Sequence, residues 1–211
     1  GLRATGSIDY SCKDVFIPEG ATHLTECTTP KRGGPLFALG IRGMSTIGHT
    51  GFTLGVGRRM LDELAALAQV KKGRFGLLGD GESFLENFGA AEAKLRAAKA
   101  FAYETWRDIE ATIYRGEPLN TRQGTLMRAS LNHVTWTIAE VSRFAYYGAA
   151  GNSLRAGALQ RFFRDMHAAT QHATSSAPIL RDCGRELAGV APDKVWGFST
   201  LMDGPAGTRR S

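Results

Sequence analysis

The stretch 159–173, LQRFFRDMHAATQHA, holds the side chains best suited to chemistry, because it combines two histidines with charged residues. An imidazole can donate or accept a proton near neutral pH, since its ordinary pKa is about 6.5. His167 and His172 are five residues apart, or about 140° around a helix, so they cannot form a two-histidine metal site on one helical face. We expect His167 to be structural, and we expect the other charged side chains to form an ion network: Arg161, Arg164 and Asp165.

Length and composition limit the class of protein. The chain has 211 residues, 43% of them hydrophobic and 22% charged, which suits one large globular domain or a domain with a fragment of another. It contains neither a run of about 18 apolar residues nor a signal-peptide pattern in its opening GLRATGSIDY, so we expect no membrane part. Its three cysteines are scattered, which is typical of a reducing cytoplasm and predicts neither a disulfide framework nor a metal site: Cys12, Cys27 and Cys183.

The net charge of +6 would permit a polyanionic partner. However, the basic residues are spread along the chain and acidic residues are interleaved with them. We therefore expect a basic solvated surface and no nucleic-acid partner. The same positive charge would also suit the binding of a cofactor that carries phosphate groups.

The pattern along the chain predicts a mainly α fold, an antiparallel four-helix bundle over residues 36–191 preceded by a remnant of a β domain. Residues 1–35 are expected to hold one strand, 8–17, followed by a loop or linker. A strand of this kind is not stable alone, so it needs a sheet from another chain or from a missing part of this one. The tail, 192–211, is expected to be poorly packed.

Apolar residues at three- and four-residue steps predict the helices. Four long ones begin near residues 37, 83, 120 and 159, and a shorter fifth covers about 179–189. Ser83 with Glu86, and Asn120 with Gln123, predict capping boxes at two helix starts. Glycines between positions 40 and 57 are costly within the first helix, and indicate that something approaches the backbone of this helix closely.

Three stretches together resemble the C-terminal region of the acyl-CoA dehydrogenase superfamily. GLRATGSIDYSCKDVFIPE is similar to the strand pair that closes the family's β domain, and KGRFG resembles its Arg-x-x-Phe-Gly turn between the first two bundle helices. LQRFFRDMHAATQHA resembles the last long helix of the branch with the type-2 C-terminal domain. The resemblance covers roughly residues 1–190. The chain lacks the family's N-terminal helical domain and most of its β domain, so the resemblance implies that it is a C-terminal piece.

That branch includes two-component aromatic hydroxylases, which take reduced flavin from a partner reductase. The family's dehydrogenases instead use a glutamate base, either early in the first bundle helix, near Ser45 here, or after the last helix, at Ala173 here. No Asp or Glu occurs within 27–61 or 166–181, and a base must lie within hydrogen-bond reach of its proton. The resemblance therefore favours a hydroxylase, with His172 as the catalytic group. A simple helix-end cap remains the alternative role for His172.

The resemblance also implies residues that contact the flavin, either FAD or FMN. Lys72 or Arg74, together with Phe75, would reach the cofactor of a neighbouring subunit, with an ordinary basic loop as the alternative. Glycines in YYGAAGNS would lie near the far end of the cofactor, unless they only end a helix: Gly148 and Gly151. Ser7 or Arg3 would face the flavin or the substrate.

The function implied is a flavin-dependent monooxygenase that uses reduced flavin and O₂ on an aromatic or similar small molecule. The expected partners are a separate flavin reductase and further copies of the chain, packed through the bundles as a homotetramer. Two alternatives stay open. One is an acyl-CoA dehydrogenase whose base lies outside this chain, and the other is a non-catalytic helical oligomerisation module without flavin.

Overall fold

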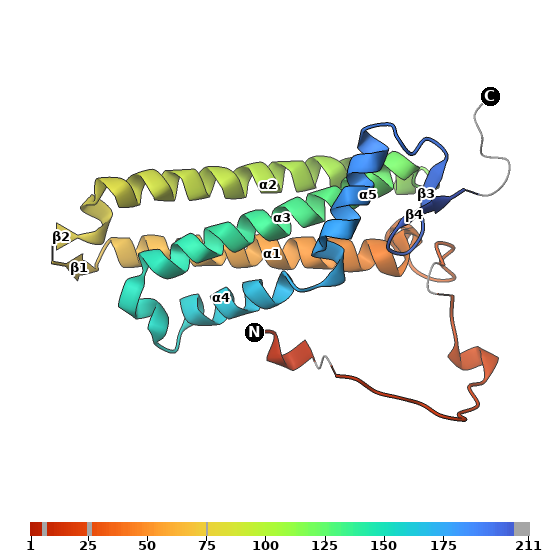
Figure 1. Ribbon diagram of the computed structural model, residues 1–211, viewed down its shortest axis with the longest axis horizontal. Helices are drawn as coiled ribbons and strands as arrows, with labels where there is room; N and C mark the ends of the chain where they lie inside the picture. The colour runs from red at the N-terminus through yellow and green to blue at the C-terminus, as the bar shows by residue number, and fades with distance from the viewer. Residues whose placement is uncertain (6–7, 25–26, 75, 205–211) are drawn as a thin grey trace.

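Four helices lie alongside one another and form an elongated bundle in the computed structural model, which describes residues 1–5, 8–24, 27–74 and 76–204 (Figure 1). They are α1 (Gly40–Ala68), α2 (Glu82–Tyr114), α3 (Thr121–Gly148) and α4 (Ala158–Ala169). A fifth helix, α5 (Ala177–Leu187), crosses the end of the bundle where α2 ends and α3 begins. The predicted mainly α fold with an antiparallel helical bundle is confirmed.

Two short hairpins contain the strands of the described residues. The first connects α1 to α2 and pairs β1 (Lys72–Gly73) with β2 (Gly76–Leu77). The second follows α5 and pairs β3 (Lys194–Trp196) with β4 (Leu201–Asp203), also antiparallel. None of the helices in the described part of the chain is long and apolar enough to cross a membrane.

The core lies around α3, which packs against each of the other four helices. Met60, Leu61 and Leu64 of α1 are fully buried there with Val134 and Ile138 of α3. Burying an aliphatic side chain of this size stabilises the fold by about 1.5–3 kcal/mol. The stripe of apolar residues on each helix therefore decides which of its faces turns inward.

The close approach expected from the glycines of the first helix is found at Gly57. A Cβ atom at this position would lie 2.7 Å from Cγ2 of Ile138 and 3.3 Å from Cδ1 of Leu95. By contrast, a Cβ atom at Gly48, Gly51 or Gly55 would meet nothing within 4 Å. Gly57 is therefore required by packing within the chain, and these three glycines are not.

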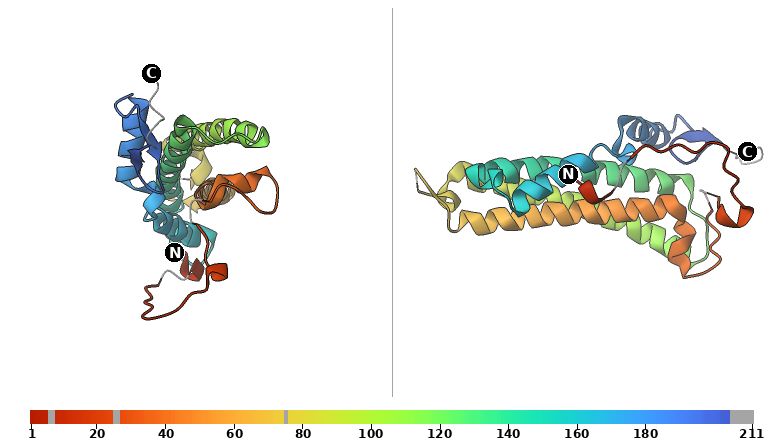
Figure 2. Two further views of the ribbon diagram at one scale, coloured as in Figure 1. Left: turned by 90° about the vertical axis from the view of Figure 1, so that its right-hand side faces the viewer. Right: turned by 90° about the horizontal axis from the view of Figure 1, so that it is seen from below.

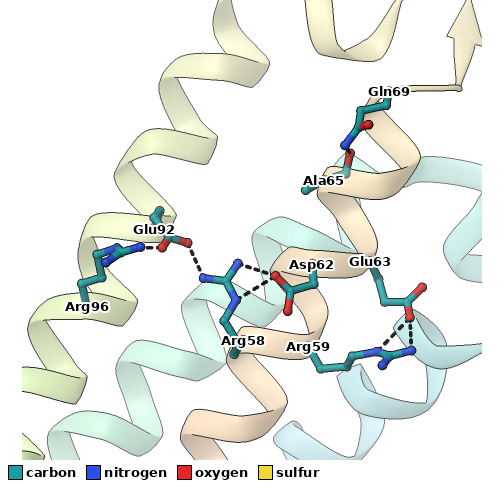
Figure 3. A network of polar contacts seen from close by, with 8 residues as sticks. All are labelled: Arg58, Arg59, Asp62, Glu63, Ala65, Gln69, Glu92 and Arg96. Atoms are coloured by element: carbon teal, nitrogen blue, oxygen red, sulfur yellow. Dashed lines mark hydrogen bonds and ion pairs between the residues drawn. The ribbon is translucent and has the colours of Figure 1, made fainter.

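A polar network joins α1 to α2 (Figure 3). Arg58 of α1 donates to Asp62 one turn later, at 2.9 Å, and to Glu92 of α2, at 2.6 Å. Arg96 also donates to Glu92, at 2.8 Å. The hydrogen bond from Arg58 and the arginine charges hold the pKa of Glu92 below its ordinary value, although burial opposes them. Beyond this network, a groove of about 700 Å³ separates the two helices.

One of the two predicted capping boxes is confirmed. Asn120 Oδ1 accepts from the Gln123 backbone N–H at 2.8 Å, and Gln123 Oε1 accepts from the Asn120 N–H at 3.1 Å. The box predicted at Ser83 is wrong, because α2 begins one residue earlier and its N-cap, Gly81, has no side chain to cap with. The chain enters α2 through the 3-10 turn η4 (Leu78–Asp80), which places Ser83 inside the first helical turn.

The predicted strand at 8–17 does not form. These residues are irregular and exposed, with Ile8 at 78% and Phe16 at 88% of full exposure. A strand needs a neighbour to satisfy its backbone groups, and no described segment lies beside this one to pair with it.

The tail is better packed than predicted, since its hairpin docks on α3 and α5. Trp196 Nε1 donates to Thr125 Oγ1 at 2.8 Å, and the Arg128 guanidinium lies 4.2 Å from the centre of the Trp196 ring. Asp182 of α5 accepts from the Thr200 hydroxyl at 2.7 Å and from the Leu201 N–H at 3.1 Å. The expectation of a poorly packed tail is therefore wrong for residues 194–203.

Candidate functional site

A cavity of about 910 Å³ opens between the N-terminal segment, α1, α3 and the segment that follows α4. The N-terminal end lies beside α4 (Figure 2) and is attached to it, because the Leu2 N–H donates to Asp165 Oδ1 at 2.7 Å. Six residues of the wall matter for chemistry: Arg3, His49, Phe52, Thr53, Thr135 and His172. No Asp or Glu is part of the described wall.

The backbone places His172 outside the helix that was expected to hold it. Helix α4 ends at Ala169, and His172 is the N-cap of the short 3-10 helix η6 (Ala173–Ser175), with an extended backbone. A cap at the C-terminal end of α4 is therefore the wrong role for this residue, but its side chain does cap a helix end, because it accepts from the Thr174 N–H at the start of η6. His172 also presents its ring to the cavity from a loop between α4 and α5.

The hydrogen bonds of His172 define its neutral tautomer. Nδ1 accepts from the Thr174 backbone N–H at 3.3 Å and lies 2.8 Å from the Thr174 hydroxyl. A backbone N–H can only donate, so Nδ1 carries no proton and the neutral ring bears its hydrogen on Nε2. His172 can therefore offer an N–H donor to a molecule in the cavity.

His49 of α1 is a member of this site that the sequence did not reveal. Its ring lies edge-to-face against that of His172, with the centroids 4.3 Å apart and the planes at 77°. Burial lowers the pKa of His49, and a positive charge on His172 lowers it further. The two residues are far apart in the sequence and share no motif. The one available signal was that both lie in stretches free of Asp and Glu.

His167 is structural, as expected. Its Nδ1 donates to the Phe163 carbonyl one turn earlier at 2.8 Å, and its ring centroid lies 4.1 Å from that of Phe163. The ion network expected beside it is wrong, because no ion pair among the described residues involves Arg161, Arg164 or Asp165. Asp165 holds the N-terminal segment instead.

Four of the residues expected to contact the flavin lie at the opposite end of the bundle from α5 (Figure 1). Lys72 and Arg74 belong to the exposed β1–β2 hairpin, and Gly148 and Gly151 lie at the end of α3 and just after it. Lys71 joins the two elements by donating to the Ala149 carbonyl at 2.7 Å. The structure thus brings these four residues to one region, apart from His172.

The two glycines of that region differ in their surroundings. A Cβ atom at Gly148 would lie 3.3 Å from Cδ2 of Leu64, so this glycine also serves helix packing. At Gly151 a Cβ atom would meet nothing within 4 Å. The remaining two predicted flavin contacts, Ser7 and Phe75, lie outside the described residues.

A sequence model of the family described as acyl-CoA dehydrogenase, C-terminal domain, matches residues 47–177, which is more than half of the chain. The chain belongs to this family. The matched segment contains both histidines of the cavity and most of the bundle, so the family's helical domain is the part that carries the candidate site.

Similar proteins with known activities are monooxygenases and a hydroxylase. Indole-3-acetate monooxygenase from Pseudomonas putida is 29% identical over 198 residues, which cover 91% of this chain and 50% of that protein. A pigment production hydroxylase from Rhodococcus erythropolis is 28% identical over 82% of this chain and 46% of its own length. The chain thus spans about half the length of the relatives it matches.

Solved structures show the same fold. XiaF from a Streptomyces species, solved in complex with FADH2 and glycerol, has a TM-score of 0.70 at 16% identity, over 82% of this chain and 45% of its own. The 3-HSA hydroxylase from Rhodococcus sp. RHA1 has a TM-score of 0.61 at 17% identity, over 74% of this chain and 42% of its own. At these identities the likeness establishes the fold alone.

Proposed function

We propose that this chain is the C-terminal half of a flavin-dependent monooxygenase that hydroxylates a small aromatic molecule with reduced flavin and O₂. The observation that carries the proposal is the cavity at His172, which offers an N–H donor from Nε2 and has no carboxylate in its described wall. The relatives named as monooxygenases and as a hydroxylase support the same class of reaction.

The cavity suits hydroxylation better than dehydrogenation. Removal of a proton next to a thioester needs a base within hydrogen-bond reach of that proton. The described wall supplies imidazoles and hydroxyls but no carboxylate. A dehydrogenase would have to bring its base from residues outside this chain. Hydroxylation instead needs a hydrogen-bond donor beside the reacting oxygen and exclusion of bulk water, which His172 and the apolar Phe52 can provide.

The residues present are compatible with a bound flavin, which supplies the reduced ring that reacts with O₂ when it is bound. The cavity of about 910 Å³ is within the range of small-molecule sites. Phe52 offers an aromatic surface, and the buried Thr53 offers a hydroxyl for which no described residue is a hydrogen-bond partner. His172 would donate from Nε2 and so orient the reacting groups. FADH2 is the cofactor bound to XiaF; for this chain both FAD and FMN remain candidates.

Lys72 and Arg74 would reach the phosphates of a flavin held by a neighbouring copy of the chain. Two observations support this assignment. The hairpin is exposed and lies apart from the His172 cavity, and Lys71 holds it beside the glycines that follow α3. Arginine and lysine are the side chains that bind phosphate oxygens most strongly. The assignment therefore requires an assembly of several copies.

A homotetramer is the assembly we propose, with the groove between α1 and α2 as a contact between copies. Leu36, Tyr103 and Tyr114 are partly exposed along it, and Gly51 and Gly55 leave its floor open. A solution mass close to that of one chain, measured by scattering on the full-length protein, would contradict this. We also propose a separate flavin reductase as partner and a cytoplasmic location.

Residues 1–35 are proposed to be the end of a β domain that lies mainly upstream of this chain, with 36–191 as the bundle and 192–211 as the tail. The exposure of Ile8, Tyr10 and Phe16 supports this, since these side chains have the size and character of strand residues that pack on a sheet. The unpaired backbone of 8–17 would join such a sheet.

Isotope labelling tests the reaction class. The full-length protein is supplied with chemically reduced FAD or FMN, ¹⁸O₂ and a panel of phenols and indoles, and the products are analysed by mass spectrometry. The proposal predicts a hydroxylated product that carries one ¹⁸O atom. Oxidation of an acyl thioester without oxygen incorporation would instead support the dehydrogenase, and failure to bind flavin at all would support the oligomerisation module.

A further inference from the structure

The cavity contains a second imidazole whose role the proposed function does not explain. His49 and His172 come from different elements, yet their rings are in edge-to-face contact at 4.3 Å. We propose that His49 is the positioning residue for His172: it holds the His172 ring so that Nε2–H remains available to the cavity. The inference rests on the proposed function for its catalytic consequence, but its structural part can be tested without activity.

The two histidines lie on elements of different kinds. His49 lies within α1, where the neighbouring Thr46 and Thr50 are buried and bond back to carbonyls of the preceding turn. His172 lies in the loop after α4, where its N–H donates to the Ala169 carbonyl at 3.2 Å and its carbonyl accepts from the Ser175 N–H at 2.9 Å. Thr174 is the only residue of the described chain that hydrogen-bonds to its side chain. A side chain on a rigid element can orient one on a loop, because its own rotamer is fixed by the packing around it.

The charges around the pair disfavour a positive charge on both rings at once. Arg3 from the N-terminal segment lines the same cavity. Helix α3 contributes the uncharged Thr135, and the segment after α4 contributes the uncharged Gln171. The described wall thus supplies a cation and no carboxylate to balance two imidazoliums. Burial and the charge of His172 both lower the pKa of His49, which favours the neutral form of the His49 ring.

This arrangement predicts two distinct effects of changing His49. Removing the ring, as in His49→Ala, frees the His172 side chain to leave the position in which Nε2–H serves the cavity. Replacing it with an uncharged ring of similar breadth, as in His49→Phe, retains the ring contact but removes the titratable group. The positioning by the ring and any effect of its charge can therefore be separated with two variants.

The first test is a double-mutant cycle on the full-length protein, with hydroxylated product and hydrogen peroxide both measured. We expect His49→Ala to lower product formation tenfold or more and to raise the share of peroxide, and His49→Phe to recover most of the rate. In a His172→Ala background, His49→Ala should cause no further loss. The exposed His23→Ala is the matched control and should change nothing. An undiminished rate in His49→Ala, or an equal loss in the His172→Ala background, would overturn the proposal.

The second test does not need activity. Histidine side chains of the full-length protein are followed by NMR as the pH is varied, in the parent and in His172→Phe. We expect His49 to titrate at higher pH in His172→Phe than in the parent, because the charge of His172 that lowers the pKa of His49 is gone. An unchanged His49 titration would overturn the proposed contact between the two rings. If the titration shifts and the parent hydroxylates nothing, the contact between the two histidines is supported and the proposed function is contradicted.

Discussion

Gly57→Ala tests whether the bundle depends on the close contact between α1 and α3. The new Cβ would lie 2.7 Å from Cγ2 and 2.9 Å from Cδ1 of Ile138, closer than carbon atoms can approach. Ile138 is fully buried, so it has no open space into which it can move. Overpacking of this kind costs about 1–3 kcal/mol, whereas replacing a helical glycine with alanine gains about 1 kcal/mol. We expect a net loss of up to about 2 kcal/mol.

Gly48→Ala is the matched control, because it lies in the same helix and its Cβ would meet nothing within 4 Å. It should gain the helical preference without the clash, so the two variants should differ by about 1–3 kcal/mol in their free energy of unfolding. Urea denaturation of the full-length protein, followed by circular dichroism, measures this difference.

The outcome in an Ile138→Ala background completes the test. Removing the side chain that the new Cβ would strike should turn Gly57→Ala into a gain of up to about 1 kcal/mol there, although Ile138→Ala is itself destabilising. If Gly57→Ala and Gly48→Ala proved equally stable, the reasoning about helix packing would be refuted.

Three further predictions concern single buried or paired side chains. Burial raises the pKa of the Cys183 thiol to about 11, so the folded state holds this proton more tightly than the unfolded state does. The free energy of unfolding should therefore fall between about pH 9 and pH 11, and urea titrations should show a smaller fall in Cys183→Ala. Burial alone would raise the pKa of Asp182, but hydrogen bonds from Thr200 and Leu201 lower it, so its contribution is present at neutral pH and is lost in acid. Asp182→Asn should therefore cost about 1–3 kcal/mol at pH 7 and less at pH 3, and unfolding curves that show the same loss at both values would contradict this. Glu92→Gln should cost up to about 1 kcal/mol in low salt and less in 1 M NaCl; a loss that does not depend on salt would show that the charges of Figure 3 contribute nothing.

The helices could be predicted from the sequence because their signals are local. The apolar stripes and the capping box at Asn120 depend on residues within a few positions of one another. The predicted strand at 8–17 failed for the opposite reason, since a strand is stable only with a partner that the described chain does not provide. The docked tail was missed because Trp196 and Asp182 act through contacts with residues far away in the sequence.

The candidate site could be predicted only in part. The resemblance of the 159–173 stretch indicated His172, but it placed the residue in a helix that ends three positions earlier. His49 could not be found, because nothing in its neighbours indicates that α1 brings it against His172. Such pairs depend on tertiary packing, and sequence spacing carries no information about them.

The most direct test of the proposed function compares His172→Ala with His167→Ala in the full-length protein. Binding of reduced flavin and the rate of substrate hydroxylation are measured separately for each variant. We expect both variants to bind flavin as the parent does. His172→Ala should lose a factor of about 10²–10⁴ in the rate of hydroxylation, whereas His167→Ala should keep most of the rate. Hydroxylation at the parental rate in His172→Ala would contradict this expectation.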